Sequence, residues 1–291
     1  MPRRSGLPPL PRSPGQWLSW FRYRTTTPDG LPHSPESLAP HLSVSGDTVR
    51  RWEAGLSEPR REDLQAFAGA CLLKAVETAF LLDAFAGQEP EAAPDPLTFV
   101  SDARNLLSGE FPAYMFDSLF YVRAWNRYMD LLRLPRVNPP MGEHILETSL
   151  QQLPPDHAGL GGNRDERQSR AVLEFWFATA RLCGTPAYRD LIARLSANVE
   201  FCDRWIRIAQ GNHSGLSEPV IAPYYVRRRE IGTYRVVTSR IAVPPVFYLR
   251  EYIPIDDAAQ GRLKDSRAKG PPTVSIRPQV HWADFRPASI T

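Results

Sequence analysis

Apolar residues recur at helical spacing along the first third of the chain. Positions three and four residues apart lie on one side of a helix, which buries that side against its neighbours. The pattern therefore predicts a series of short helices between Gly15 and Ala86. The apolar residues that define them are Trp17, Leu18, Phe21, Leu38, Ala39, Leu42, Val49, Trp52, Leu64, Phe67, Ala68, Cys71, Val76, Ala79, Phe80, Leu82 and Phe85.

Two of these helices begin with residues that favour a helix start. Ser34 precedes Pro35; a serine at the N-cap accepts a backbone N–H, and a proline at the first helical position needs no donor of its own. Ser45 stands in the same relation to the next helix, in which Val49 and Trp52 are expected to face inward.

Residues 97–255 contain stretches with the helical spacing of apolar residues and stretches with the composition and alternation typical of strands. Helices are expected at 97–107, 125–132, 166–182 and 187–208. Strands are expected at 113–117, 119–124, 232–241 and 245–253, with a turn at Asp117 and Ser118 between the first two and a hairpin formed by the last two. The fold class that follows is a mainly α N-terminal bundle joined to an α+β domain.

An acidic, Pro-rich segment separates these two parts of the chain, as such linkers commonly do. The expected organisation is an N-terminal domain at 15–88, a linker at 89–96, a second domain at 97–255 and a polar tail at 256–291 that ends loosely.

Charge is distributed unevenly. The 291 residues carry a formal net charge of only +3, but residues 1–61 hold nine Arg against five acidic residues. A basic N-terminal segment is suited to contact with phosphates. An ordinary solvated surface would have the same composition, so charge alone leaves both interpretations open.

The remaining composition narrows the class of protein. Cys71, Cys183 and Cys202 are far apart, so we expect reduced packing residues and no disulfide framework. The histidines lack metal-ligand spacing, so no metal site is expected. No apolar run is long enough to span a membrane, and the N-terminal residues do not resemble a secretory signal, so a cytoplasmic location without membrane contact is expected.

The segment from Ser34 to Gly55 contains V-S-x-x-T-V-x-x-W-E-x-G, starting at Val44. It resembles the Cro/repressor-type (XRE) helix-turn-helix. The resemblance implies that the second helix of the motif enters the major groove of double-stranded DNA. The residues it assigns to DNA contact are Ser45, Gly46, Asp47, Arg50, Arg51, Arg60 and Arg61.

An alternative stays open for this motif. Pro35 and Pro40 stand where such motifs more often keep backbone donors or a glutamine, and Ser43 replaces a usual turn glycine. At the start of the second helix of the motif, Gly46 and Asp47 offer little side chain with which to contact bases. These features also suit a protein-interaction module whose degenerate helix-turn-helix binds no specific DNA.

A second resemblance covers about residues 97–255. It rests on P-A-Y-x-x-D at Pro112, on A-W-N-R at Ala124, on the segment from Asn198 to Trp205 and on the hairpin after Gly232. These resemble the MmyB-like ligand-binding domain. The resemblance implies a PAS-like sheet flanked by helices that senses an apolar, fatty-acid-like ligand. A PAS-like fold can also hold haem or flavin, but no cofactor is expected here.

Aromatic residues are dense in this domain and supply the candidate pocket wall. An ordinary buried core would hold the same residues, so at each position both interpretations, a pocket wall and a packed core, remain open. Two arginines are candidate partners for a ligand carboxylate, since an unpaired buried charge is costly. The candidate ligand-binding residues are Tyr114, Phe116, Trp125, Phe175, Trp176, Trp205, Arg123 and Arg181.

The chain shows no catalytic signature. It lacks G-x-S-x-G, a phosphate-binding P-loop and a dinucleotide fingerprint. The sequence therefore predicts a ligand-responsive transcription regulator, not an enzyme. Because one small helix-turn-helix makes few contacts, a homodimer on two half-sites about 34 Å apart is expected.

Overall fold

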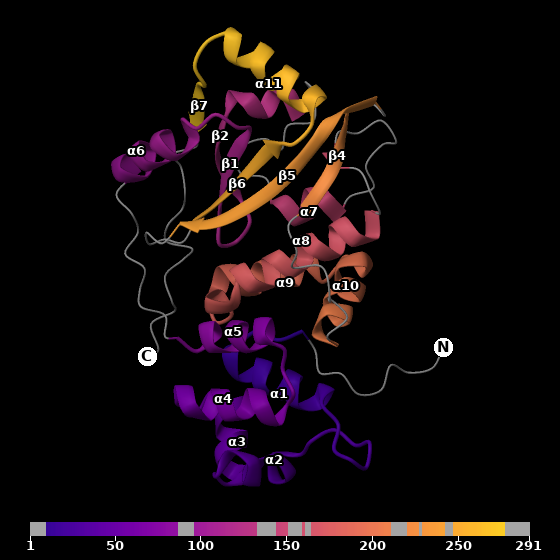
Figure 1. The fold of residues 1–291 in the computed structure, drawn as a ribbon. Helices are drawn as coiled ribbons and strands as arrows, with labels where there is room; N and C mark the ends of the chain where they lie inside the picture. The colour runs from indigo at the N-terminus through magenta and orange to yellow at the C-terminus, as the bar shows by residue number, and fades with distance from the viewer. Residues whose placement is uncertain are drawn as a thin grey trace. The chain divides into compact units, whose positions relative to one another are not determined.

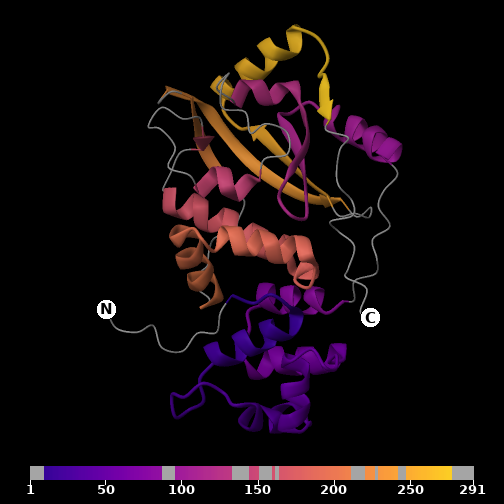
Figure 2. The same ribbon diagram turned by 180° about the vertical axis from the view of Figure 1, so that it is seen from behind.

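The computed structural model describes residues 10–86, 96–132, 144–150, 159–160, 164–210, 220–226, 229–241 and 247–276. The chain divides into two compact units. Of the described residues, 10–86 and 176–210 form the first, which we call the helical unit. The others form the second, the sheet unit. The fold is mixed α+β (Figures 1 and 2).

The helical unit is built from short helices. They are α1 (Pro14–Arg24), α2 (Pro35–Leu42), α3 (Gly46–Glu53), α4 (Arg61–Ala70), α5 (Ala75–Ala84), the 3-10 helix η2 (Ala180–Leu182), α9 (Pro186–Leu195) and α10 (Val199–Ala209). The expected helix starts are confirmed: the hydroxyls of Ser34 and Ser45 accept the backbone N–H groups of Ser37 and Thr48.

Aromatic rings form the core of this unit. The ring centroids of Trp17 and Trp176 lie 4.6 Å apart, and those of Trp176 and Trp205 lie 4.7 Å apart. Phe80 contacts the ring of Trp17 edge-on at 4.7 Å. Such tilted and edge-on pairs are the preferred aromatic geometries.

A single helix over 187–208 was the wrong expectation. The chain leaves helical geometry after Leu195 and re-enters it at Val199. Asn198 causes the break locally, because its side-chain oxygen accepts the N–H groups of Glu200 and Phe201 and so caps a new helix.

The sheet unit contains seven described strands. They are β1 (Ala113–Asp117), β2 (Val122–Asn126), β3 (Gly159–Leu160), β4 (Val220–Val226), β5 (Arg229–Ile241), β6 (Phe247–Pro254) and β7 (Val274–Ile276). The strand order is β3-β4-β5-β6-β1-β2-β7, and every neighbouring pair is antiparallel. The expected strand at 113–117 and the expected β5–β6 pairing are confirmed.

Helices cover both faces of this sheet. They are α6 (Pro96–Leu107), the 3-10 helix η1 (Arg127–Leu132), α7 (Ile145–Leu150), α8 (Arg164–Ala178) and α11 (Asp257–Ala268). Helices α6 and α11 lie on one face, which we call the α6 face, and α7 and α8 lie on the opposite α8 face (Figures 1 and 2). The division between the two units falls within α8, between Phe175 and Trp176.

Two sequence expectations need correction here. Trp125 and Asn126 belong to strand β2 instead of starting a helix, and only 127–132 is helical, as a 3-10 helix. The polar segment after Asp256, expected as a tail, contains α11 and β7. Gly232 lets α11 approach the sheet, because it has φ +134° and a side chain there would collide with the backbone of Ala259.

The expected linker at 89–96 lies almost wholly outside the described residues. The expected domain limits remain a prediction. The division into units groups residues 176–210 with the N-terminal helices, whereas the sequence expectation assigned them to the second domain.

Candidate nucleic-acid interface and ligand-binding residues

A tight turn joins α2 to α3. Ser43 ends α2 in the left-handed conformation, with φ 54° and ψ 35°. The N–H of Val44 then bonds back to the carbonyl of Ala39 at 3.3 Å, and Ser45 caps α3. A serine in this conformation is strained relative to glycine, so the turn forms here despite an unfavourable residue.

Helix α3 has one buried and one exposed face. Val49 is fully buried and Trp52 nearly so, at 5% exposure. Asp47, Arg50 and Arg51 are exposed. A polar face on a helix anchored by two apolar side chains is available to a partner.

A part-buried ion pair anchors the end of α3. The guanidinium of Arg22 in α1 donates to both carboxylate oxygens of Glu53, at 2.6 and 2.8 Å, and to the carbonyl of His33 at 2.6 Å. Burial alone lowers the pKa of Arg22, but the hydrogen bonds and charge of Glu53 raise it overall. This bidentate pair fixes the orientation of α3 relative to α1.

Arg50 already has acidic neighbours. Its guanidinium forms an ion pair with Glu36 at the start of α2, and Asp47 lies 3.9 Å from it. A Cβ at Gly46 would lie 3.0 Å from a carboxylate oxygen of Glu36, which shows how closely α2 and α3 approach. A phosphate or a base at Arg50 would have to compete with these carboxylates.

The other candidate DNA-contacting residues are also accessible. Ser45, Arg60 and Arg61 are exposed and Gly46 is partly so. Arg60 precedes α4, and its backbone N–H donates to the carboxylate of Asp63 at 2.9 Å. That hydrogen bond fixes the start of α4 and leaves both arginine side chains at the surface.

Four of the candidate ligand-binding residues share the sheet unit's α8 face. The ring centroids of Tyr114 and Phe116 on β1 lie 5.8 Å apart. The ring of Phe120 bridges β1 and α8, because its centroid lies 4.8 Å from that of Phe116 and 5.5 Å from that of Phe175. Trp125 is the β2 partner of Tyr114 in the sheet register, so its side chain projects to the same face. The structure therefore brings these four residues to one side of the sheet.

Trp176, Trp205 and Arg181 belong to the helical unit instead. The two tryptophans lie in its aromatic core, and the guanidinium of Arg181 pairs with Asp83 of α5 at 2.5 Å. They therefore form a group of their own, separate from the residues on β1.

Arg123 has a structural partner. Its Nε donates to the carboxylate of Asp117 at 2.6 Å. Asp117 also accepts the N–H groups of Leu119 and Tyr121, at 2.9 and 3.0 Å. This network closes the turn between β1 and β2, in which Phe120 adopts a left-handed φ of 65°.

Sequence reasoning missed Arg250 on β6. It is 9% exposed, and its guanidinium donates to the hydroxyls of Tyr114 at 2.9 Å and Thr238 at 3.1 Å and pairs with Glu174 of α8. Burial alone lowers the pKa of Arg250, but the charge of Glu174 raises it overall. The strand period of two places Arg250 beside Tyr248 and Tyr252, and this signal could have found it.

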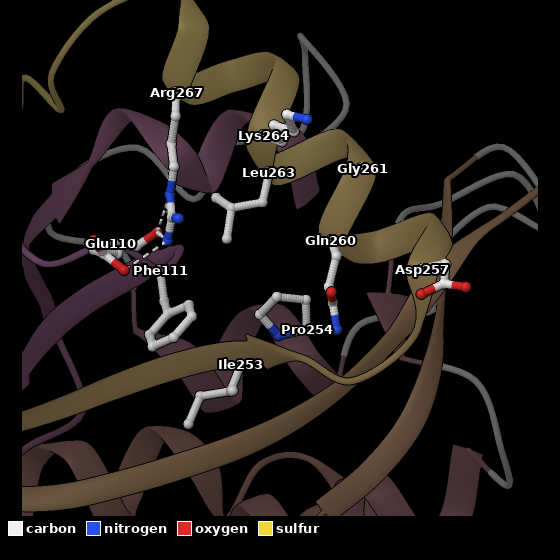
Figure 3. A pocket seen from close by; sticks show the side chains of 10 residues that line it. All are labelled: Glu110, Phe111, Ile253, Pro254, Asp257, Gln260, Gly261, Leu263, Lys264 and Arg267. Atoms are coloured by element: carbon white, nitrogen blue, oxygen red, sulfur yellow. Dashed lines mark hydrogen bonds and ion pairs between the residues drawn. The ribbon is translucent and has the colours of Figure 1, made fainter.

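A surface groove lies on the other side of the sheet. It has a volume of about 590 Å³ and runs between α11, the end of β6 and residues just before β1 (Figure 3). Its lining includes Phe111, Ile253 and Leu263. None of the residues expected from the sequence to bind ligand line it.

No family model matches this chain, and neither does any curated protein. Within the described part of the chain, no helix has the length and apolar character needed to cross a membrane. The described residues also include no group of three or more His, Cys, Asp or Glu side chains that would hold a metal ion.

Proposed function

We propose that this protein is a DNA-binding transcription regulator that reads DNA with α3. The observation that carries the proposal is the two-faced character of this helix. Val49 and Trp52 are buried, while Asp47, Arg50 and Arg51 are exposed after a tight turn and a capped start. This is the arrangement that a helix-turn-helix uses to hold its second helix in a major groove. It also agrees with the resemblance to the XRE type.

The sheet unit is proposed to be a PAS-like sensing domain for an apolar, fatty-acid-like ligand. Supporting this, Tyr114, Phe116 and Phe175 lie on one face of its sheet, and Arg250 lies among them. Arg250 is better placed than Arg123 or Arg181 to meet a ligand carboxylate on that face. Binding would require Arg250 to exchange its partner Glu174 for the ligand.

DNA recognition by two copies is part of the proposal. A homodimer would place two α3 helices on half-sites about 34 Å apart. Light scattering at micromolar concentration, with and without DNA, measures this directly, and a monomer under both conditions would contradict it.

The DNA assignment is tested with a duplex selected by the wild-type protein from a randomised pool. Replacing Arg50 and Arg51 together by Ala is expected to weaken binding at least about tenfold. The slope of log Kd against log salt should also fall by about 0.9 for each phosphate that the variant no longer neutralises. The matched control replaces two other exposed arginines, Arg104 and Arg189, by Ala. It removes the same amount of charge and should leave both the affinity for DNA and the salt slope close to those of the wild type.

One observation favours a second candidate function. Because Arg50 is paired with Glu36 and close to Asp47, the exposed face of α3 is partly neutralised. That suits a protein-interaction module without specific DNA binding. If the pool yields no enriched sequence, or if the Arg50 and Arg51 variant binds the duplex as the wild type does while folded, this second function replaces the first.

The sensing assignment is tested by calorimetric titration of the full chain with saturated fatty acids of increasing length. Each added methylene should strengthen binding by about 0.8 kcal/mol until the site is full. Phe116→Ala on the α8 face should weaken binding, whereas Met115→Ala, whose side chain lies on the α6 face, should not. The absence of binding heat at every chain length would overturn the fatty-acid assignment.

A further inference from the structure

The groove beside α11 has an apolar floor and a charged rim. Leu263 of α11 points towards Phe111, which lies just before β1, and Ile253 of β6 completes the apolar lining (Figure 3). Its volume of about 590 Å³ falls in the range of small-molecule sites. The side of the groove formed by α11 carries one stripe of residues, namely Asp257, Gln260, Gly261, Lys264 and Arg267.

Gly261 is the unusual member of this stripe. It lies in the interior of α11 and is exposed, and a Cβ there would meet no atom within 4 Å. A glycine in a helix interior reduces stability relative to alanine, and no neighbour requires it here. Its effect is to leave the helix backbone bare in the wall of the groove, where a flat molecule can approach closely.

Charge is arranged unequally around the groove. Arg267 donates to the carbonyl oxygen of Glu110 at 2.9 Å and to its carboxylate at 3.1 Å, with its guanidinium carbon 6.0 Å from the centre of the Phe111 ring. Lys264 is exposed and has no ion-pair partner among the described residues. Asp257 belongs to the same stripe but lies in the first turn of α11, about two helical turns from Lys264. The α11 side of the groove therefore offers an anion the charge of Lys264, and its apolar lining is supplied by Leu263 of the same helix and by Phe111 across the groove.

We propose that this groove binds a small carboxylate with a flat apolar body. The body lies on Phe111 and Leu263 and against the bare backbone at Gly261. The carboxylate lies at Lys264, beside Arg267, where it gains a charge-assisted hydrogen bond. The site goes beyond the proposed function, because it shares no residue with the exposed face of α3 or with the aromatic residues on the α8 face.

The test uses 1-naphthoate as the probe and the full chain as the protein. Calorimetry or ligand-observed NMR should give saturable binding with a Kd of about 1 mM or tighter. Gly261→Leu should weaken binding at least about tenfold by filling the groove, while the melting temperature stays level or rises, since leucine favours helix more than glycine does.

Gly69→Leu is the matched control. Gly69 is also an exposed helical glycine whose Cβ would meet no atom within 4 Å, but it lies in α4. This variant should bind naphthoate as the wild type does.

Lys264→Gln supplies a second, independent readout. It should weaken naphthoate several-fold and leave the neutral analogue 1-naphthalenemethanol unaffected. Non-saturable binding to the wild type, or equal affinity in the wild type and Gly261→Leu, would overturn the proposal. Equal effects of Lys264→Gln on both probes would also contradict the placement of the carboxylate. No DNA is present in these measurements, so their failure is distinct from failure of the DNA-binding assignment.

Discussion

The two faces of the sheet differ in kind, although alternate residues of the same strands build both. On the α6 face, Met115 and Leu249 pack with Leu107 of α6 in an apolar cluster. On the α8 face, Arg250 donates a hydrogen bond to the hydroxyl of Tyr114, forms an ion pair with Glu174 and lies over the ring of Phe116. One strand therefore contributes to an apolar environment on one face and to a polar, charged environment on the other.

The difference shows which face the fold depends on for stability. Burying methylenes on the α6 face stabilises in proportion to the area removed from water. Burying the Arg250–Glu174 pair recovers little, because desolvation offsets most of the attraction between the charges. A buried charge that contributes little net stability is a candidate for function, and this supports the ligand assignment of the α8 face.

The largest predicted effect is at Arg250. Arg250→Ala should lower the free energy of unfolding by about 3–5 kcal/mol, because it leaves buried polar groups without their partner. Urea denaturation followed by circular dichroism measures this change. The double variant Arg250→Met with Glu174→Leu should recover to within about 1–2 kcal/mol of the wild type, because both charges are then removed. A double variant as unstable as the single one would show that the α8 face needs this ion pair to fold.

An intermediate effect is predicted where α11 covers the sheet. Gly232→Ala should destabilise by about 1–3 kcal/mol, since the added Cβ collides with the backbone of Ala259 and φ is +134°. Differential scanning calorimetry gives the change in Tm. Gly261→Ala in α11 is the control, because the added Cβ meets no atom within 4 Å. This variant should stabilise the protein slightly. Equal responses of the two variants would refute the close packing of α11 on β5.

The smallest predicted effect depends on pH. Asp256 caps α11 by accepting the N–H of Ala259, and it also accepts the N–H of Thr233 of β5. These hydrogen bonds lower its pKa below the ordinary value of 3.8. The charged form therefore stabilises the fold at pH values above that ordinary value, and the contribution is lost as the pH falls through the lowered folded pKa.

Asp256→Ala should cost about 1 kcal/mol at neutral pH, as the loss of a helix cap usually does. Asp256→Asn keeps a capping oxygen and should cost less. Urea denaturation between pH 7 and strongly acidic pH should show the wild type and Asp256→Asn converging in acid. A constant difference between them across this range would rule out ionised Asp256 as the cap.

Local elements were the predictable part of the fold. The starts of α2 and α3 were predicted at Ser34 and Ser45, and β1 was predicted with its observed bounds, because hydrogen bonds and periodicity within a few residues decide them. The helical break at Asn198 was missed, although the same capping chemistry marks it. Sequence reasoning gave more weight there to the continuing apolar pattern.

The candidate sites depended more on long-range packing. The pairing of Arg50 with Glu36 could not be predicted, because it needs the approach angle of α2 and α3. Phe175 and Trp176 are adjacent in sequence and looked equivalent, yet Phe175 contacts Phe120 while Trp176 contacts Trp17. Successive residues of a helix point in directions about 100° apart, so only the packing around α8 decides what each one touches.

The sequence by itself determined the starts of α2 and α3, the alternation along β1 and β6, and the exposed arginines of α3, since each follows from backbone hydrogen bonds and side-chain periodicity. Only the tertiary structure decided that a polar segment after Asp256 folds as a helix on the sheet and that Arg250 lies against Tyr114 and Glu174. The strand order also belongs to the tertiary structure. It brings together residues more than one hundred positions apart, and no local pattern specifies which of many apolar surfaces will meet.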